Sequence, residues 1–313
     1  MRLLPHAHAY LNRLGPTPLV PVTMMGPGDV TVWCKLEFLN PSGSTKDRVA
    51  RYILEKAWRE ERIGPESTVV EASSGSTSIA MALACAQMGI AFTAVMPEGV
   101  SGERVHIIRA YGGRIVLTPK ADGIRGAIAE TERLASETGV FLPRQFSNPD
   151  NAQAHRTGTA REILDQIPGG IVDAVVSGVG TGGTLVGLFQ GFREGGCRVM
   201  PVVARPVNLT EGSLGGAECC SFSARIPGVV DSMSTIFSPE ALPGLVTIEV
   251  RDDEALAATR ELMRLGFPVG PSSGLNYRAA QIVAARLQGR AQIVTVFPDR
   301  MERYFSTELF VRG

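Results

Sequence analysis

Residues 68–96, TVVEASSGSTSIAMALACAQMGIAFTAVM, decide the fold class of this chain. The runs TVVEA at 68–72 and FTAVM at 92–96 have the composition of buried strands, and the alanine-rich stretch between them, which ends at Gly89, has that of a buried helix. A strand followed by a helix and a second strand predicts a parallel sheet. The uncharged residues 78–96 approach the length of a membrane span, but Gly89 divides them, so we interpret them as a helix and a strand.

The same alternation continues through the rest of the chain. Further runs of strand composition lie at 114–118, 174–180, 198–204, 246–250 and 293–297, and amphipathic helical stretches lie at 123–138 and 253–265. Three predicted strands precede residue 120 and four follow residue 170, so we expect two sheets and two domains. The predicted fold class is α/β, with a mostly parallel, twisted sheet flanked by helices in each domain and the active site in the cleft between them.

The composition restricts the partners. The 313 residues include 31 Lys and Arg and 31 Asp and Glu, without a basic run, which argues against nucleic acid or an anionic membrane and favours a small molecule. Five cysteines without a C-x-x-C pair predict a reduced, cytoplasmic protein, in which Cys219 and Cys220 are small buried or loop residues. The start of the chain lacks a secretory signal pattern, and the four histidines have no metal-ligand spacing, so we expect no metal.

Three turns rich in glycine and hydroxyl residues each connect an apolar run to a helical stretch, which is where α/β proteins bind ligands. The turn SSGSTS at 73–78 has more hydroxyl groups than helix capping requires, and predicts a carboxylate site at the start of a helix that begins near Ile79. In the turn VGPSSG at 269–274, Ser272 is either a helix N-cap or a site residue.

The third turn, GVGTGGT at 178–184, matches the dinucleotide pattern G-x-G-x-x-G. The next strand ends with Arg205 instead of the acidic residue that a ribose hydroxyl requires, which disfavours NAD and leaves NADP as an outside alternative. The turn therefore predicts a cradle for a single phosphate, with backbone amides and the hydroxyls of Thr181 and Thr184 as donors.

One lysine stands out in the segment PSGSTKDR at 41–48. Lys46 follows a run of small hydroxyl and glycine residues, and in such neutral surroundings an amine can have a lowered pKa and can approach a carbonyl group freely. The alternative is a solvated lysine beside Asp47.

Taken together, the chain resembles the fold type II enzymes that use pyridoxal 5′-phosphate, with a tryptophan synthase β-subunit-like fold, and within them the cysteine synthase (O-acetylserine sulfhydrylase) family. Seven motifs in order carry the resemblance: LGPTPLV at 14–20, LNPSGSTKDR at 39–48, SSGST at 73–77, QFSNPDN at 145–151, GTGGT at 180–184, GPSSG at 270–274 and RYFSTELF at 303–310.

The resemblance implies a complete site. Lys46 would carry the cofactor as a Schiff base and remove the substrate α-proton, and Ser272 would contact the pyridine nitrogen. The residues expected to bind the cofactor phosphate are Gly180, Thr181, Gly182, Gly183 and Thr184. The residues expected to hold the substrate carboxylate are Ser73, Ser74, Gly75, Thr77 and Gln145. The resemblance also implies a homodimer, a smaller substrate-side domain at 36–145 and a larger cofactor-phosphate domain formed by 1–35 and 146–313.

The implied activity is β-replacement on O-acetylserine or O-phosphoserine by a sulfur nucleophile, giving cysteine or S-sulfocysteine. Other reactions on the same cofactor stay open, namely those of a cysteine desulfhydrase, a diaminopropionate synthase or a serine/threonine dehydratase, as does a non-catalytic binding protein. EASSGST and Asn276 resemble the subgroup that includes S-sulfocysteine synthases and cysteine desulfhydrases.

The chain departs from the family pattern at two places. Ser76 replaces an asparagine that contacts the cofactor ring oxygen. SARIPGVVDSMS at 223–234 replaces the usual closing segment, and its Arg225 is a candidate for reading a substrate phosphate or sulfonate.

Overall fold

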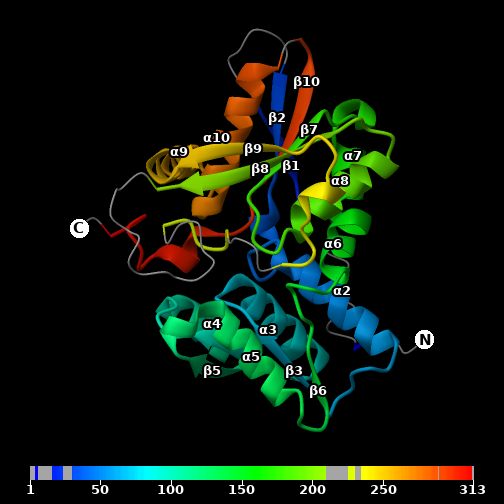
Figure 1. Ribbon diagram of the computed structural model, residues 1–313, viewed down its shortest axis with the longest axis vertical. Helices are drawn as coiled ribbons and strands as arrows, with labels where there is room; N and C mark the ends of the chain where they lie inside the picture. Colours follow the sequence, from blue (N-terminus) through cyan, green and yellow to red (C-terminus); the bar gives the residue numbers. More distant parts are fainter. Residues whose placement is uncertain are drawn as a thin grey trace.

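The computed structural model describes residues 4–5, 16–23, 30–208, 225–229, 234–287 and 289–311, and its strands form two separate sheets (Figure 1). The larger sheet contains, in spatial order, β1 (Leu19–Thr23), β2 (Val30–Lys35), β10 (Ala291–Val296), β7 (Ala174–Ser177), β8 (Met200–Val207) and β9 (Val246–Arg251). The smaller sheet contains β5 (Arg114–Thr118), β4 (Ala91–Pro97), β3 (Thr68–Ala72) and β6 (Val140–Phe141). All neighbours are parallel except β1 and β2, so the predicted pair of mostly parallel sheets is confirmed.

Helices cover both faces of the larger sheet. Val176 of β7 packs in one core with α9 (Asp252–Arg264) and α10 (Pro271–Arg286), whereas the adjacent Val175 packs in another with α7 (Ala160–Gln166) and α8 (Gly183–Glu194). A strand that is buried on both faces has a nearly continuous apolar sequence, which is why β7, β8 and β10 of this sheet could be predicted.

The smaller sheet has the same layered arrangement. Val69 of β3 packs with α2 (Lys46–Arg59), α3 (Ser76–Met88) and α4 (Gly102–Ala110), and Val70 packs on the other face with α5 (Gly123–Leu134). Shorter helical segments complete the described fold: η1 (Glu37–Leu39), η2 (Lys120–Asp122), α6 (Asp150–Ala154), the π-helical turn η3 (His155–Thr159), η4 (Pro168–Gly170), η5 (Pro239–Ala241) and η6 (Met301–Tyr304).

The seven predicted strands are present, and the structure adds β1, β2 and β6. The four strands of the smaller sheet lie within 36–145, and those of the larger sheet lie outside it. The division of the chain into two domains at these boundaries stays a prediction.

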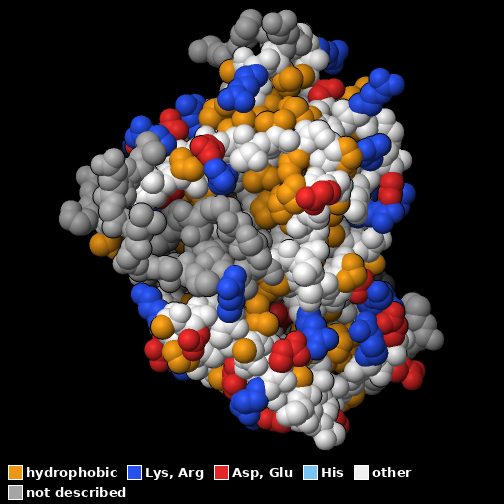
Figure 2. Space-filling view, viewed as in Figure 1, with side chains coloured by type: hydrophobic (Ala, Val, Ile, Leu, Met, Phe, Trp, Pro, Cys, Tyr) orange, Lys and Arg blue, Asp and Glu red, His pale blue; other side chains and the backbone are white. Residues whose placement is uncertain are grey.

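The described part of the chain has no helix long and apolar enough to cross a membrane, and residues 78–96 form α3 and β4 instead. On the face seen in Figure 2, basic and acidic side chains are interspersed. Cys219 and Cys220 lie outside the described residues.

Candidate active site

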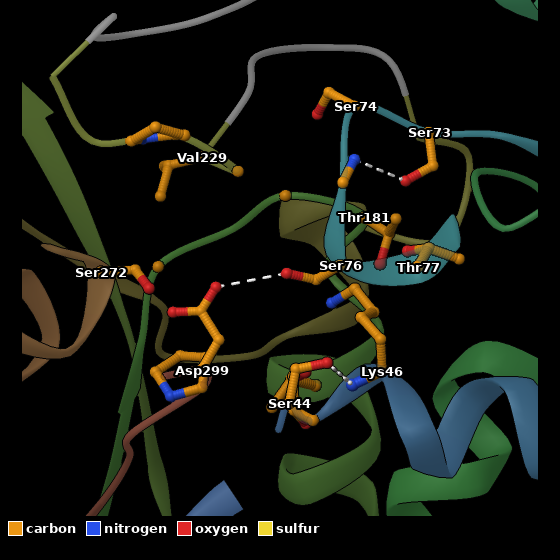
Figure 3. A pocket seen from close by; sticks show the side chains of 18 of the residues that line it. Ser44, Lys46, Ser73, Ser74, Ser76, Thr77, Thr181, Val229, Ser272 and Asp299 are labelled. Carbon is orange, nitrogen blue, oxygen red and sulfur yellow. Dashed lines mark hydrogen bonds between the residues drawn. The ribbon is translucent and has the colours of Figure 1, made fainter. Parts of the chain in front are cut away.

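Lys46 is the first residue of α2, and its side chain points into a pocket between the two sheets (Figure 3). The pocket is lined mainly by small neutral residues, and the resulting loss of hydration lowers the pKa of the Lys46 ammonium, whereas the Asp299 carboxylate raises it. The amine is therefore easier to deprotonate than that of a lysine in water, which suits a nucleophile or a base.

The turn before Lys46 is held in place from both ends. Asp47 accepts hydrogen bonds from the Ser42 amide at 2.9 Å and the Ser42 hydroxyl at 2.5 Å. Arg303 donates to the main-chain oxygen of Gly43 at 3.1 Å, and Gly43 has a φ of +83°, which glycine adopts without strain. Gly43 and Asp47 therefore have structural roles in the turn, whereas Lys46 lines the pocket.

The glycine-rich turn at 178–184 connects β7 to α8 and faces Lys46 across the pocket. A Cβ at Gly180 would lie 2.3 Å from the Gly228 carbonyl oxygen, and Gly182 has a φ of +79°. The turn can thus contain only glycine at these two positions. Thr181 and Thr184 line the pocket, and the N-terminal end of α8 favours negative charge, so the turn suits a phosphate group.

The serine-rich turn at 73–78 forms a second polar wall. The Ser73 hydroxyl accepts hydrogen bonds from the amides of Gly75 at 3.1 Å and Ser78 at 3.3 Å. Thr77 donates to the Gln145 side chain at 2.6 Å, and that side chain donates to the Ala72 carbonyl at 2.6 Å. The α3 helix begins at Ser76, three residues earlier than predicted, which brings Ser76, Thr77 and Ser78 into its first turn.

Ser272 lies in the first turn of α10, whose N-cap is Gly270, and it lines the pocket. The neighbouring Asn276 accepts a hydrogen bond from the Gly178 amide at 2.7 Å and donates to the Val296 carbonyl at 2.8 Å. Asn276 therefore fixes the start of the glycine-rich turn relative to the end of β10.

Most of the residues predicted from the sequence surround this single pocket: Lys46, Ser73, Ser74, Gly75, Ser76, Thr77, Gln145, Gly180, Thr181, Gly182, Thr184 and Ser272. Two do not line it. The Gly183 amide donates to the Thr181 hydroxyl oxygen at 3.4 Å, and Arg225 forms a partly exposed ion pair with Glu308. Arg205, considered for NADP, pairs with Glu249 away from this pocket.

Two charged residues of the pocket, Asp299 and Arg104, were not predicted from the sequence. Asp299 follows β10 and lies between Ser272 and Ser76 (Figure 3), accepting hydrogen bonds from Ser76 at 3.2 Å and Tyr304 at 2.7 Å. Arg104 of α4 reaches the Ser74 carbonyl at 3.3 Å. Asp299 could have been found from its place after the last parallel strand, because ligands bind at the carboxyl ends of such strands.

These features fit pyridoxal phosphate. A Cβ at Gly180 would collide with the main chain at Gly228, so glycine lets the turn pack closely at the edge of the pocket, where main-chain groups can approach a phosphate. Thr181 and Thr184 line the same pocket as Lys46, whose amine has a lowered pKa. Within the described residues, no group of three or more His, Cys, Asp or Glu side chains is arranged to hold a metal ion.

Comparison with known proteins agrees with this geometry. A model of the family described as "Pyridoxal-phosphate dependent enzyme" matches residues 10–299. Cysteine synthase B of Campylobacter jejuni is 36% identical over 302 residues, which cover 95% of this chain and 96% of that protein.

Two solved structures are also similar. An O-ureido-L-serine synthase has a TM-score of 0.83 and 34% identity, covering 96% of this chain and 94% of that one. An O-acetylserine dependent cystathionine beta-synthase from Helicobacter pylori has a TM-score of 0.84 and 32% identity, covering 99% of this chain and all of that one (100%). This chain therefore belongs to the family of pyridoxal-phosphate dependent enzymes of fold type II, and pyridoxal 5′-phosphate is its cofactor.

Proposed function

We propose that this enzyme replaces the β-substituent of an activated serine, O-acetylserine or O-phosphoserine, with a sulfur nucleophile, giving cysteine or S-sulfocysteine. The observation that carries the proposal is the position of Lys46, whose amine lies in one pocket with a phosphate-type turn at 178–184 and a carboxylate-type turn at 73–78. The similarity to a cysteine synthase and to an O-acetylserine-dependent synthase supports the same reaction class.

Each wall of the pocket has a role in the proposed reaction. Lys46 would hold the cofactor and, once displaced by the substrate amine, would take the proton from the substrate α-carbon. Gly180, Thr181, Gly182, Gly183 and Thr184 would hold the phosphate, with the Gly183 amide acting through the Thr181 hydroxyl. Ser272 would meet the pyridine nitrogen, and a hydroxyl there leaves that nitrogen largely unprotonated. Pyridoxal phosphate itself supplies an electron sink for the charge that develops at the α-carbon.

The substrate carboxylate would bind at the N-terminal end of α3, where Ser73, Ser74, Gly75 and Thr77 lie with Gln145. In the structure Gln145 is oriented by Thr77 and the Ala72 carbonyl, so its amide is already fixed when the substrate arrives. Ser76 donates to Asp299 instead of reaching further into the pocket. The departure from asparagine at this position is thus paired with an acidic neighbour.

A visible absorption spectrum of the purified enzyme tests the proposal, recorded before and after addition of O-acetylserine and then of O-phosphoserine. We expect a cofactor band in the wild type, a band shift with at least one of the two substrates, and no lysine-bound band in Lys46→Ala. Product analysis with sulfide, thiosulfate and an amine as second substrates then separates synthesis of cysteine or S-sulfocysteine from diaminopropionate formation. Incubation with cysteine alone, which would release sulfide, detects desulfhydration, and incubation with serine or threonine alone, which would release a keto acid and ammonia, detects dehydration. A protein that takes up no added pyridoxal phosphate would overturn the proposal.

Arg225 would bind a substrate phosphate or sulfonate only after its ion pair with Glu308 is broken. The same assay with O-phosphoserine tests this role, because Arg225→Ala would lower the rate with O-phosphoserine but not with O-acetylserine. Unchanged rates with both substrates would remove Arg225 from the site.

The enzyme is also proposed to be a cytoplasmic homodimer. Cys34, Cys85 and Cys197 are buried free thiols, in agreement with a reducing compartment, and the dimer follows from the family resemblance. Sedimentation analysis of the holoenzyme tests the dimer, and a monomer at micromolar concentration would contradict it.

A further inference from the structure

A buried asparagine lies directly behind the phosphate turn. Asn151 of α6 is 1% exposed, and its amide nitrogen is 2.8 Å from the main-chain oxygen of Gln145 and 2.9 Å from the Thr181 hydroxyl oxygen. The Gln145 oxygen can only accept a hydrogen bond, so the nitrogen of the Asn151 side chain, and not its oxygen, must face it. The second hydrogen of that nitrogen is then donated to Thr181.

This contact sets the direction of the Thr181 hydroxyl. The Thr181 oxygen accepts from Asn151 and, at 3.4 Å, from the Gly183 amide. Both interactions use its lone pairs, so its single hydrogen is available for a group in the pocket that Thr181 lines. Asn151 also occupies the space next to Gly183, where a Cβ would lie 2.1 Å from its side-chain oxygen.

A histidine holds the second threonine of the turn in a comparable way. His155, four residues after Asn151, is fully buried, with Nε2 3.3 Å from the Thr184 hydroxyl and Nδ1 2.9 Å from the Thr159 hydroxyl. Burial lowers the pKa of His155 to about 3, so the ring is neutral at pH 7 and carries one hydrogen. If Thr159 donates to Nδ1, the hydrogen is on Nε2 and is donated to Thr184, whose own hydrogen is then available for the pocket.

We propose that Asn151 and His155 are positioning residues that direct the hydroxyl hydrogens of Thr181 and Thr184 into the pocket, toward the cofactor phosphate. The inference rests on the proposed role of the turn at 178–184. A hydroxyl that donates to the protein instead presents a lone pair to the anion, so the direction of each hydrogen decides whether the threonine attracts or repels phosphate.

Replacing Asn151 with aspartate tests the proposal, because a carboxyl group cannot donate to both the Gln145 main-chain oxygen and the Thr181 hydroxyl. Its ionised form only accepts hydrogen bonds, and its neutral form has a single hydrogen, which the Gln145 oxygen would take. In either form the oxygen facing Thr181 accepts, and the Thr181 hydroxyl would turn away from the pocket. We would titrate the apoenzyme with pyridoxal 5′-phosphate and with pyridoxal, which has the same ring and aldehyde but no phosphate. In Asn151→Asp the affinity for pyridoxal phosphate should fall by about 100-fold, because the hydrogen bond from Thr181 to the phosphate is lost and a lone pair of its hydroxyl then repels the phosphate. The affinity for pyridoxal should change by less than about threefold.

Gln153→Glu is the matched control, since it makes the same amide-to-acid change on the same helix, at a partly exposed side chain that pairs with Arg156. It should leave both affinities within about threefold of the wild type. An equal loss of both ligands in Asn151→Asp would overturn the proposal and make Asn151 a packing residue. A wild type that binds the two ligands equally would instead contradict the phosphate role of the turn itself, so the two failures are distinguishable.

Two further measurements do not depend on the folding of Asn151→Asp. In a double-mutant cycle, Asn151→Ala should add less than about twofold to the loss of pyridoxal phosphate affinity in Thr181→Ala, because Asn151 acts through that hydroxyl. Additive losses would contradict this. The nitrogen-15 spectrum of the holoenzyme, assigned with His155→Gln, should show His155 with its hydrogen on Nε2, and a hydrogen on Nδ1 would remove His155 from the proposal.

Discussion

Lys46 and Asp299 show how two single residues determine the reactivity of the site. Burial lowers the pKa of the lysine and the nearby carboxylate raises it. Replacing Asp299 with asparagine removes the negative charge but keeps an oxygen that can accept from Ser76 and Tyr304. The pKa of Lys46 should therefore fall further, and because only the neutral amine reacts, reductive methylation of Lys46 in the apoenzyme at pH 7 should become about threefold faster or more. Mass spectrometry of the labelled peptide measures this rate.

The control for this prediction is Glu302→Gln, three positions along the chain, which removes a carboxylate that pairs with Arg300 outside the pocket. Its labelling rate should match that of the wild type. A slower reaction of Asp299→Asn would mean that the carboxylate serves to deprotonate Lys46 and not to stabilise its charge.

At the scale of elements, Glu71 joins the end of β3 to the turn that carries Gln145. Its buried carboxyl group accepts hydrogen bonds from the main-chain amides of Ala72 at 3.0 Å and Gln145 at 3.1 Å. Gln145 follows Arg144, a non-glycine residue with a φ of 55°. Burial raises the pKa of Glu71 to about 8. Its contribution to stability is therefore fully present below pH 4.5, the value for the unfolded chain, and is lost as the pH rises through about 8.

The substitution Glu71→Gln tests this linkage in the apoenzyme. At pH 5 the variant should be less stable than the wild type by about 1–3 kcal/mol. The reason is that the side-chain NH2 of the glutamine would face the main-chain N–H of either Ala72 or Gln145, and that N–H would lose its acceptor. The difference in the free energy of unfolding between wild type and variant should narrow by up to about 1.4 kcal/mol per pH unit toward pH 8. Only the wild type loses stability over this range, because glutamine cannot ionise. Urea unfolding across this range measures the gap, with the exposed Glu66→Gln as the control. A gap that stays constant with pH would contradict the raised pKa.

The same scale shows what the sequence could predict. Strands buried on both faces, such as β7 (AVVS) and β10 (AQIVTV), were predicted because most of their residues are apolar. β1 was missed because it contains Pro21 and forms the edge of its sheet, and β6 because it has only two residues. The site motifs were predicted because glycine and hydroxyl runs are unusual. Asn151 and Asp299 were not singled out, since their importance depends on partners, Thr181 and Ser76, that are distant in sequence.

At the scale of the whole molecule, a buried charge network joins the helix of Lys46 to segments around both sheets. Arg48 of α2 donates to Glu37 at 2.6 Å and to Glu162 of α7 at 2.6 Å, and Glu162 also pairs with Lys35, the last residue of β2. Burial alone would raise the pKa of Glu37, but Arg48 and the Thr17 hydroxyl outweigh it and bring the pKa to about 2. Glu37 thus stays ionised inside the protein because Arg48 is there.

Removing Arg48 should therefore cost much more than an ordinary surface ion pair. Arg48→Met leaves the Glu37 charge buried without its main partner, and we expect a loss of about 3–5 kcal/mol in the free energy of unfolding of the apoenzyme in urea. Arg48→Met combined with Glu37→Gln should recover part of this loss, because the uncompensated charge is gone. Arg51→Met removes a half-exposed arginine on the same helix from Glu55, which keeps its ion pair with Arg59, and should cost less than about 1 kcal/mol. If the double variant is no more stable than Arg48→Met, the loss comes from packing around the arginine side chain and not from the buried charge.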